Sequence, residues 1–251
     1  MTPDEVTRYA RHIVLREIGG PGQQKLLRAK LLCVGAGGLG SPALLYLAAA
    51  GVGRLGIVDD DEVSLSNLQR QILYGTDDIG AAKTQRAKQA LARINPHVEV
   101  ELHSIRLDQS NAPEIISRYD LVLDGSDNFE TRYLVNAACV QAKIPLVSAA
   151  MSQWEGQISV YDPANGSPCY RCVFPEAPAE GLAPNCAQAG VMGALAGVMG
   201  SMMAAEAIKM ITKAGKSLTG ELLIYDSLYG ETRKLRLHRR KDCPDCGGRT
   251  R

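Results

Sequence analysis

The chain has 251 residues, of which 45% are hydrophobic and 22% are charged, with a formal net charge of +1. This length predicts one α/β core with an appendage. Aromatic residues make up only 5%, which argues against a base-stacking surface, and the net charge gives no general attraction to nucleic acid or to a membrane. The segment from Met1 to Arg11 lacks the apolar run of a signal peptide, so we expect a cytoplasmic protein.

Predicted helices and strands alternate through the first 150 residues. Helical signals extend from Asp4 to Glu17 and resume after Pro21. Strands are predicted at 31–34, 55–58, 98–102, 121–124 and 145–148, with helices at 42–50, 78–94, 112–118 and 130–142. This alternation predicts a doubly wound, mostly parallel α/β sheet of the Rossmann-like type, with helices on both faces.

The pattern changes after Met151. Strands at 157–161, 222–225 and 232–237 have no helices between them, which predicts a smaller antiparallel extension. The apolar run from Gly190 to Ala205 is too short for a membrane span and predicts a buried helix, while the proline-rich stretch 175–184 predicts a mobile loop. We therefore expect two parts, with the N-terminal helices and main sheet in residues 1–150 and the extension, loop and tail in residues 151–251.

A glycine turn, Gly-Ala-Gly-Gly-Leu-Gly, connects the first predicted strand to the next helix. Its glycines are Gly35, Gly37, Gly38 and Gly40, and they fit the G-x-G-x-x-G pattern of nucleotide-binding turns. Such glycines let the backbone approach phosphate, and the helix N-terminus adds free N–H groups. Asp59, at the end of the following strand, is suited to bind ribose hydroxyls. The pattern predicts a nucleotide but leaves an NAD-dependent oxidoreductase as an alternative.

Two cations after the Asp59 strand favour a polyphosphate. Arg70 lies in the segment Ser-Asn-Leu-Gln-Arg-Gln at 66–71, and Lys83 lies near the start of the next predicted helix. A triphosphate carries more negative charge than the pyrophosphate of a dinucleotide and needs Arg or Lys partners. These cations therefore favour ATP over a dinucleotide.

A further polar group closes the strand at 121–124, at the edge of the sheet where ligands of parallel sheets bind. Asp127 in this group is a candidate Mg²⁺ ligand, because Mg²⁺ takes oxygen ligands and few of them from protein. The alternative is that Asp127 caps the helix that follows, since Asp and Asn are favoured at that position.

The chain has seven cysteines, and four of them form two C-x-x-C pairs, Cys169 with Cys172 and Cys243 with Cys246. If the fold brings the pairs together, they make a four-thiolate zinc site of structural type, and paired redox thiols are the alternative. Cys186 stands apart in the predicted loop, where it is either a nucleophile toward the activated substrate or a small packing residue.

Over nearly its full length the chain resembles the ThiF and MoeB family of adenylyltransferases, which are bacterial relatives of ubiquitin-activating enzymes. The resemblance rests on Arg-Tyr-Ala-Arg at 8–11, the glycine turn, Asp59 and Asp61, the block at 64–71, Lys83, Asp127-Asn128, the segment from Cys186 to Val191 and both C-x-x-C pairs. It implies a homodimer in which Arg11 reaches the triphosphate of the neighbouring subunit. Gly125 and Ser126 depart from the family, which often has Cys or Ala and then Thr there.

The resemblance also implies an ATP site, Mg²⁺ at Asp127 and structural zinc at the four paired cysteines. The expected nucleotide-site residues are Gly35, Gly37, Gly38, Gly40, Asp59, Asp61, Ser66, Asn67, Leu68, Gln69, Arg70, Lys83, Asp127 and Asn128. The catalytic residues expected among these and elsewhere are Arg11, Arg70, Lys83, Asp127 and Cys186.

The implied reaction is ATP-dependent adenylation of the C-terminal glycine carboxylate of a small ubiquitin-like sulfur carrier ending in Gly-Gly. Sulfur would come from a separate sulfurtransferase or cysteine desulfurase. The cited residues do not distinguish a molybdopterin carrier from a thiazole (thiamine) carrier. Two other hypotheses stay open, an NAD-dependent oxidoreductase and a nucleotide-binding module without catalysis.

Overall fold

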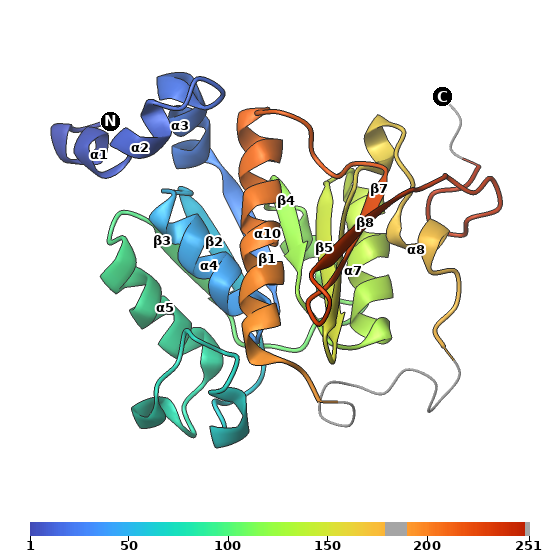
Figure 1. Cartoon of the computed structure of the whole chain (residues 1–251), viewed down its shortest axis with the longest axis horizontal. Helices are drawn as coiled ribbons and strands as arrows, with labels where there is room; N and C mark the ends of the chain where they lie inside the picture. The colour runs from blue at the N-terminus through green and yellow to red at the C-terminus, as the bar shows by residue number, and fades with distance from the viewer. Residues whose placement is uncertain (179–189, 249–251) are drawn as a thin grey trace.

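One sheet of eight strands organises the chain, in the order β3-β2-β1-β4-β5-β6-β7-β8. The structure is a computed structural model, and it describes residues 1–178 and 190–248. The first five strands in this order, β3, β2, β1, β4 and β5, pair in parallel. Strands β5, β6, β7 and β8 pair in antiparallel fashion. The antiparallel extension is therefore continuous with the parallel sheet through β5 (Figure 1).

The parallel half alternates with helices as its apolar periodicity predicts. Its strands are β1 (Lys30–Val34), β2 (Arg54–Val58), β3 (Glu99–His103), β4 (Leu121–Asp124) and the first residues of β5 (Leu146–Ser152). Its helices are α3 (Gly19–Arg28), α4 (Gly40–Ala49), α5 (Lys83–Ile94), α6 (Ala112–Ile116) and α7 (Phe129–Ala142), with short 3₁₀ turns η1 (Leu65–Asn67) and η2 (Thr76–Asp78).

The C-terminal part completes the sheet and ends in a cysteine-bearing tail. It contains β6 (Glu155–Tyr161), η3 (Pro163–Asn165), α8 (Tyr170–Val173), α10 (Gly193–Thr212), β7 (Glu221–Asp226) and β8 (Glu231–Arg236). The boundary proposed at residue 150 falls inside β5, which hydrogen-bonds to strands on both sides of it. The division of the chain into two parts stays a prediction.

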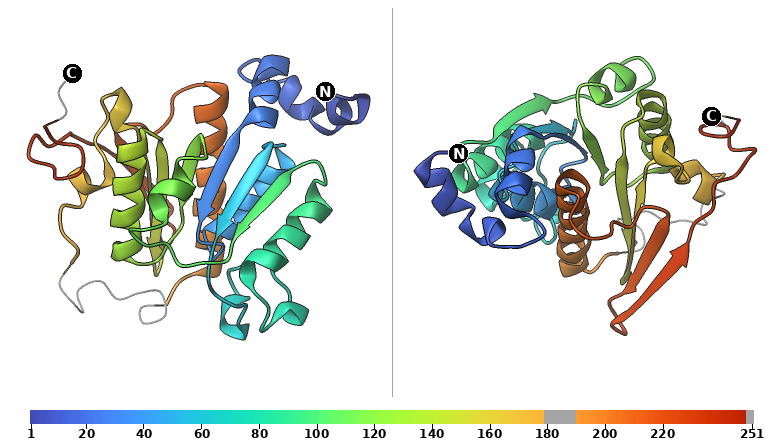
Figure 2. Two further views of the ribbon diagram at one scale, coloured as in Figure 1. Left: turned by 180° about the vertical axis from the view of Figure 1, so that it is seen from behind. Right: turned by 90° about the horizontal axis from the view of Figure 1, so that it is seen from above.

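Successive residues of the central strands point to opposite faces, so each face has its own apolar core. Leu31 and Cys33 pack with α3, α4, α5 and α10, whereas Leu32 and Val34 pack with α6 and α7. Figure 2 shows the sheet from behind and from above, with these helices on its two faces. The strands are apolar in nearly every position because both faces are covered.

Helix α10 is long and apolar enough to cross a membrane by length and composition. In the fold it packs against α4, β5 and β6, with Leu195, Met199 and Met203 fully buried. This core position confirms the buried helix expected from the apolar run and accounts for its composition.

The N-terminal helices lie at the end of the sheet where the parallel strands begin. Helices α1 (Pro3–Arg8) and α2 (Ala10–Ile13) meet at Tyr9, whose buried hydroxyl accepts a hydrogen bond from Asn95 Nδ2 at 2.8 Å. Asn95 directly follows α5. Figure 1 shows α1 and α2 at the same end of the sheet as the start of β1. The single helix expected from Asp4 to Glu17 is therefore wrong in its extent, because the helix is interrupted at Tyr9.

One other boundary differs from expectation. A helix was predicted from residue 78, but α5 begins at Lys83, after a 3₁₀ turn that closes at Asp78. Gly80 has φ +83°, a left-handed conformation that ends the turn and separates it from the helix. This delay places Lys83 in the first turn of α5, beside the end of β2.

Candidate active site

A cleft of about 800 Å³ opens at the carboxyl ends of the parallel strands. Its walls come from the glycine turn after β1, the end of β2, the segment around η1, the loop after β4 and the facing parts of β5 and β6. This is the edge at which open α/β sheets bind ligands. Of the residues expected at the nucleotide site, the cleft brings together Gly35, Gly37, Gly38, Asp59, Asp61, Asn67, Arg70, Lys83, Asp127 and Asn128.

The glycine turn is shaped by two positions that exclude a side chain. Gly35 has φ +87°, which L-residues with side chains rarely adopt, and a Cβ at Gly40 would overlap the carbonyl oxygen of Gly35. These restrictions bring α4 directly beneath the turn, so that its N-terminus faces the cleft.

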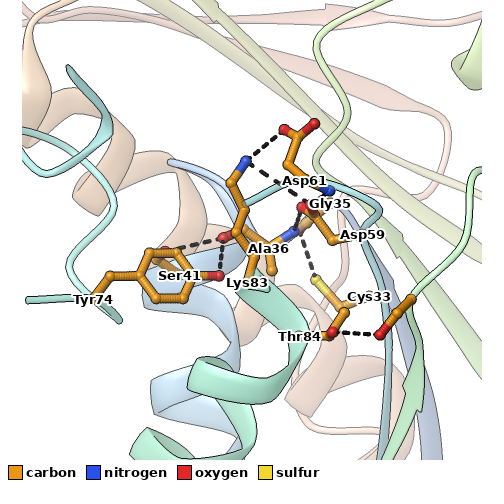
Figure 3. Close-up of polar contacts among 10 residues, drawn as sticks. Cys33, Gly35, Ala36, Ser41, Asp59, Asp61, Tyr74, Lys83 and Thr84 are labelled. Atoms are coloured by element: carbon orange, nitrogen blue, oxygen red, sulfur yellow. Dashed lines mark hydrogen bonds and ion pairs between the residues drawn. The ribbon is translucent and has the colours of Figure 1, made fainter. Parts of the chain in front are cut away.

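Hydrogen bonds to both the N–H and the carbonyl group of one residue, Ala36, fix the turn (Figure 3). Its N–H donates to Asp59 Oδ2 at 2.8 Å, while its carbonyl oxygen accepts from Tyr74 Oη at 2.8 Å and from Ser41 Oγ at 3.4 Å. Tyr74 is buried, and burial raises the pKa of its hydroxyl, which stays a neutral donor. The glycine turn is thus held rigidly before any ligand enters.

Asp59 and Lys83 form the charged floor of the cleft. Asp59 also accepts the Asp61 N–H at 3.0 Å, and Lys83 Nζ lies 2.6 Å from Asp61 Oδ2 and 3.9 Å from Asp59 Oδ1. The Lys83 side chain is only 5% exposed. Burial raises the pKa of Asp59, while the Lys83 charge and the two backbone N–H groups oppose this rise. Lys83 therefore already has carboxylate partners within the protein.

The segment from Ser66 to Gln71 places only part of its side chains in the cleft. Asn67, Arg70 and Gln71 line it, and Arg70 Nη1 donates to the Ser66 carbonyl at 3.1 Å. Leu68 packs on the apolar core instead, and the Gln69 backbone contacts Gly193 at the start of α10. The cleft lining also excludes Ser66 and Gly40, which were expected at the nucleotide site.

The loop after β4 presents Asp127 to the cleft. Asn128 caps α7, because its Oδ1 accepts the Thr131 N–H at 2.8 Å. The capping role considered for Asp127 is therefore filled by its neighbour, and Asp127 is exposed in the cleft wall. An exposed carboxylate oxygen without a capping role fits the ligand chemistry of Mg²⁺.

Arg11 is an exposed residue of α2, and Figure 1 shows α2 at the end of the sheet where the parallel strands begin. The cleft is lined by residues at the opposite, carboxyl ends of these strands. Arg11 does not line the cleft of its own chain. Any contact between Arg11 and a ligand in such a cleft must therefore involve a second copy of the chain.

The two C-x-x-C pairs meet beside α8, and their four Sγ atoms lie within 4.8 Å of one another. The Sγ–Sγ distances are 3.4 Å for Cys172 and Cys246, 3.5 Å for Cys169 and Cys243, and 3.9 Å for Cys169 and Cys172. Four sulfurs at about 2.3 Å from a tetrahedral zinc are separated by roughly 3.8 Å, so the cluster fits zinc.

The surroundings of the cysteine cluster agree with a closed metal site. The described cysteines are free thiols. Burial raises the pKa of Cys246 to about 11, so a cation would be needed to hold this residue as a thiolate. Burial also acts to raise the pKa of Cys243, but hydrogen bonds from the Cys246 and Asp245 backbone outweigh burial and lower that pKa. The backbone N–H of Arg240 points at Cys172 Sγ, 3.4 Å away. Cys186 lies outside the described residues.

Two cleft residues were not singled out from the sequence. Gln71 is 4% exposed and its Oε1 has no hydrogen-bond partner among the described residues, which leaves an acceptor for a ligand. Arg132 is 6% exposed and lies in the first turns of α7. Its position four residues after the helix cap at Asn128 is the available signal, but an arginine on a helix is usually a surface residue.

The sheet order, the glycine turn and the cleft together define an α/β protein built to bind a nucleotide. The chain belongs to the ThiF family, whose family model matches residues 9–245. It is 50% identical over 250 residues to the sulfur carrier protein adenylyltransferase of Thermus thermophilus, and this match covers 98% of the chain and 92% of that protein. It is 47% identical to the probable adenylyltransferase/sulfurtransferase MoeZ of Mycobacterium tuberculosis, covering 97% of the chain and 63% of that longer protein.

Solved structures show the same fold. E. coli MccB with MccA-N7isoASN has a TM-score of 0.85 at 24% identity, over 96% of this chain and 75% of that chain. The same protein with ATP has a TM-score of 0.80 at 24% identity, over 90% of this chain and 69% of that chain.

Proposed function

We propose that this chain uses ATP to adenylate the C-terminal glycine carboxylate of a small ubiquitin-like sulfur carrier. The observation that carries the proposal is a preorganised nucleotide site in a chain that is 50% identical, over nearly its whole length, to a sulfur carrier protein adenylyltransferase. MccB with bound ATP has the same fold, which supports ATP as the nucleotide. A relative named for a sulfur carrier supports a sulfur carrier as the substrate, and we place the reaction in the molybdopterin or the thiazole pathway.

In this proposal the cleft residues bind different parts of ATP. The glycine turn and the N-terminus of α4 would bind phosphate, and Asp59 would bind the ribose. Arg70 and Lys83 would neutralise the polyphosphate. Asp127 would hold Mg²⁺, which when bound neutralises charge on the phosphates.

The proposed chemistry is an in-line displacement. A carboxylate oxygen of the carrier forms a bond to the α-phosphorus, the bond from that phosphorus to the bridging oxygen breaks, and pyrophosphate leaves with the electron pair. A C-terminal carboxyl has a pKa of about 3.3–3.7, so the nucleophile is ionised at neutral pH and needs no general base. The residues must instead align the two anions and stabilise the developing negative charge.

The dimer completes the site in this proposal. Arg11 lies at the far end of its own sheet, so we propose that it reaches the triphosphate bound by a second copy of the chain. The cysteine cluster takes no part in the chemistry, because four sulfurs leave no open coordination position on zinc. The zinc would tie the C-terminal tail to α8.

Pyrophosphate exchange tests the proposal. The purified chain with a Gly-Gly-ending sulfur carrier should incorporate labelled pyrophosphate into ATP, and a carrier lacking the last glycine should give no exchange. Failure with molybdopterin and thiazole carriers alike would overturn the proposed function. An oxidoreductase would instead change NADH absorbance, although no histidine lines the described cleft to serve as acid or base.

A further inference from the structure

A buried arginine lies where the parallel and antiparallel halves of the sheet meet. Arg132 Nη2 donates to the Ser126 carbonyl in the loop after β4, and Nη1 lies 3.5 Å from Ser148 Oγ on β5. Arg132 also lines both the main cleft and a small neighbouring cavity that Gln157 of β6 and Leu222 of β7 help to form. The guanidinium therefore lies in the cleft wall beneath the loop after β4, whose residues Gly125 and Ser126 adjoin Gly35 of the glycine turn.

The partners of Arg132 are neutral. Ser126 and Ser148 contribute uncharged oxygens, and Tyr170, which also bonds to Arg132, has its pKa raised to about 12 by burial. The buried carboxylate of Asp124 is connected to Arg132 through both serines, since its Oδ1 accepts from Ser126 Oγ at 2.6 Å and its Oδ2 accepts from Ser148 Oγ at 3.4 Å. Over residues 1–178 and 190–248, Lys83 forms ion pairs with carboxylates whereas Arg132 forms none.

A buried charge without a carboxylate in direct contact is unfavourable, and neutral hydrogen-bond partners offset only part of the cost. An anion bound in the cleft beside Arg132 would contact the guanidinium directly and offset the remaining cost of burying its charge. The N-terminus of α7, with its cap at Asn128, adds partial positive charge at the same place. Of the two anions in the proposed reaction, the triphosphate belongs to the glycine turn, which leaves the carboxylate.

We infer that Arg132 binds the C-terminal carboxylate of the protein substrate and holds it for attack. This inference rests on the proposed function, and it makes Arg132 the residue by which the enzyme distinguishes a free carboxyl end from other chain ends. A bidentate guanidinium–carboxylate contact fixes the orientation of the carboxylate as well as its position.

The test compares a Gly-Gly-ending carrier with a free carboxylate to the same carrier made as a C-terminal amide. Binding is measured by calorimetry in the presence of a non-hydrolysable ATP analogue. The wild type should bind the acid at least about tenfold more tightly than the amide, as expected for hydrogen bonds to a charged group. Arg132→Gln should bind both forms within about twofold of each other and keep the wild-type affinity for the analogue.

Arg118→Gln is the matched control, because Arg118 lies outside the cleft lining, has a side chain 50% exposed and should leave the acid preference unchanged. If Arg132→Gln does not fold, Arg132→Lys replaces it and must keep a preference for the acid because it keeps the charge. The inference is overturned if folded Arg132→Gln retains the tenfold preference, if a folded Lys variant loses it, or if Arg132→Gln loses analogue binding as well.

Failure of the inference and failure of the proposed function give different results. A wild type that catalyses exchange but binds acid and amide equally overturns only the role of Arg132. A wild type without exchange for any carrier overturns the proposed function itself.

Discussion

The two sides of the cleft contribute different kinds of side chain. Beside β1 and β2, Asp59, Lys83 and the Ala36 peptide are bound to one another before a ligand arrives. Beside β4 and β5, Arg132 is buried with neutral oxygens as its direct partners. The comparison indicates that the nucleotide side is preorganised by the protein's own contacts, whereas the opposite wall is left to be completed by the substrate.

The largest expected effect concerns Asp127, in the loop after β4. Asp127→Ala should lower pyrophosphate exchange by about 100-fold or more, since electrostatic groups of this kind contribute on that scale. Its Tm should stay at the wild-type value, because Asp127 is exposed and caps no helix. Asn128→Ala provides the contrast, with a loss of about 1 kcal/mol of stability from the missing cap. Exchange retained within tenfold in Asp127→Ala would show that Asp127 is not needed.

The second prediction asks whether the preorganised side is complete within one chain. Arg11→Ala and Arg70→Ala homodimers should each be nearly inactive, because each loses a charge-assisted phosphate contact. After random subunit exchange, half of the dimers are heterodimers with one intact site of two, so about one quarter of the wild-type activity should return. Mixed dimers with verified exchange and no activity would place the Arg11 contribution within its own chain.

The third prediction concerns the antiparallel side, where the tail is held by the cysteine cluster. Purified protein should contain about one zinc per chain, and Cys246→Ala should lose the zinc and several degrees of Tm. Cys139→Ala is the control, since Cys139 is a buried cysteine of α7 outside the cluster and should keep its zinc. Metal analysis showing no zinc in freshly prepared wild type would contradict the assignment.

The smallest expected effect concerns the single hydrogen bond from Tyr74 to the Ala36 carbonyl, on the preorganised side of the cleft. Tyr74→Phe removes one of the two hydroxyl donors to the Ala36 carbonyl, which should cost about 1 kcal/mol and raise the KM for ATP by a few fold. Tyr133→Phe should leave the KM unchanged, because the buried Tyr133 hydroxyl has no partner among the described residues. Equal KM values for the two variants would argue against a role for Tyr74 in holding the turn.

Much of the fold could be predicted from local pattern alone. Strand β4 was placed at its observed bounds, and the alternation of helices and strands correctly predicted a mostly parallel sheet with antiparallel strands after it. Boundaries set by single residues were harder to predict. The break at Tyr9 and the late start of α5 depend on packing of that tyrosine and on the left-handed Gly80, which periodicity does not report.

For the site, the sequence by itself indicated the residues whose pattern is local: the glycine turn, Asp59 and each C-x-x-C pair taken separately. The fold brought the two cysteine pairs together. Tertiary structure decided the rest. In the fold, Lys83 pairs with Asp61 and Leu68 packs in the core. Asn128 caps α7, and Arg132 is buried beneath the loop after β4. Burial and ion pairing depend on neighbours that are distant along the chain, so a pattern of residue types cannot tell which cations have carboxylate partners within the protein.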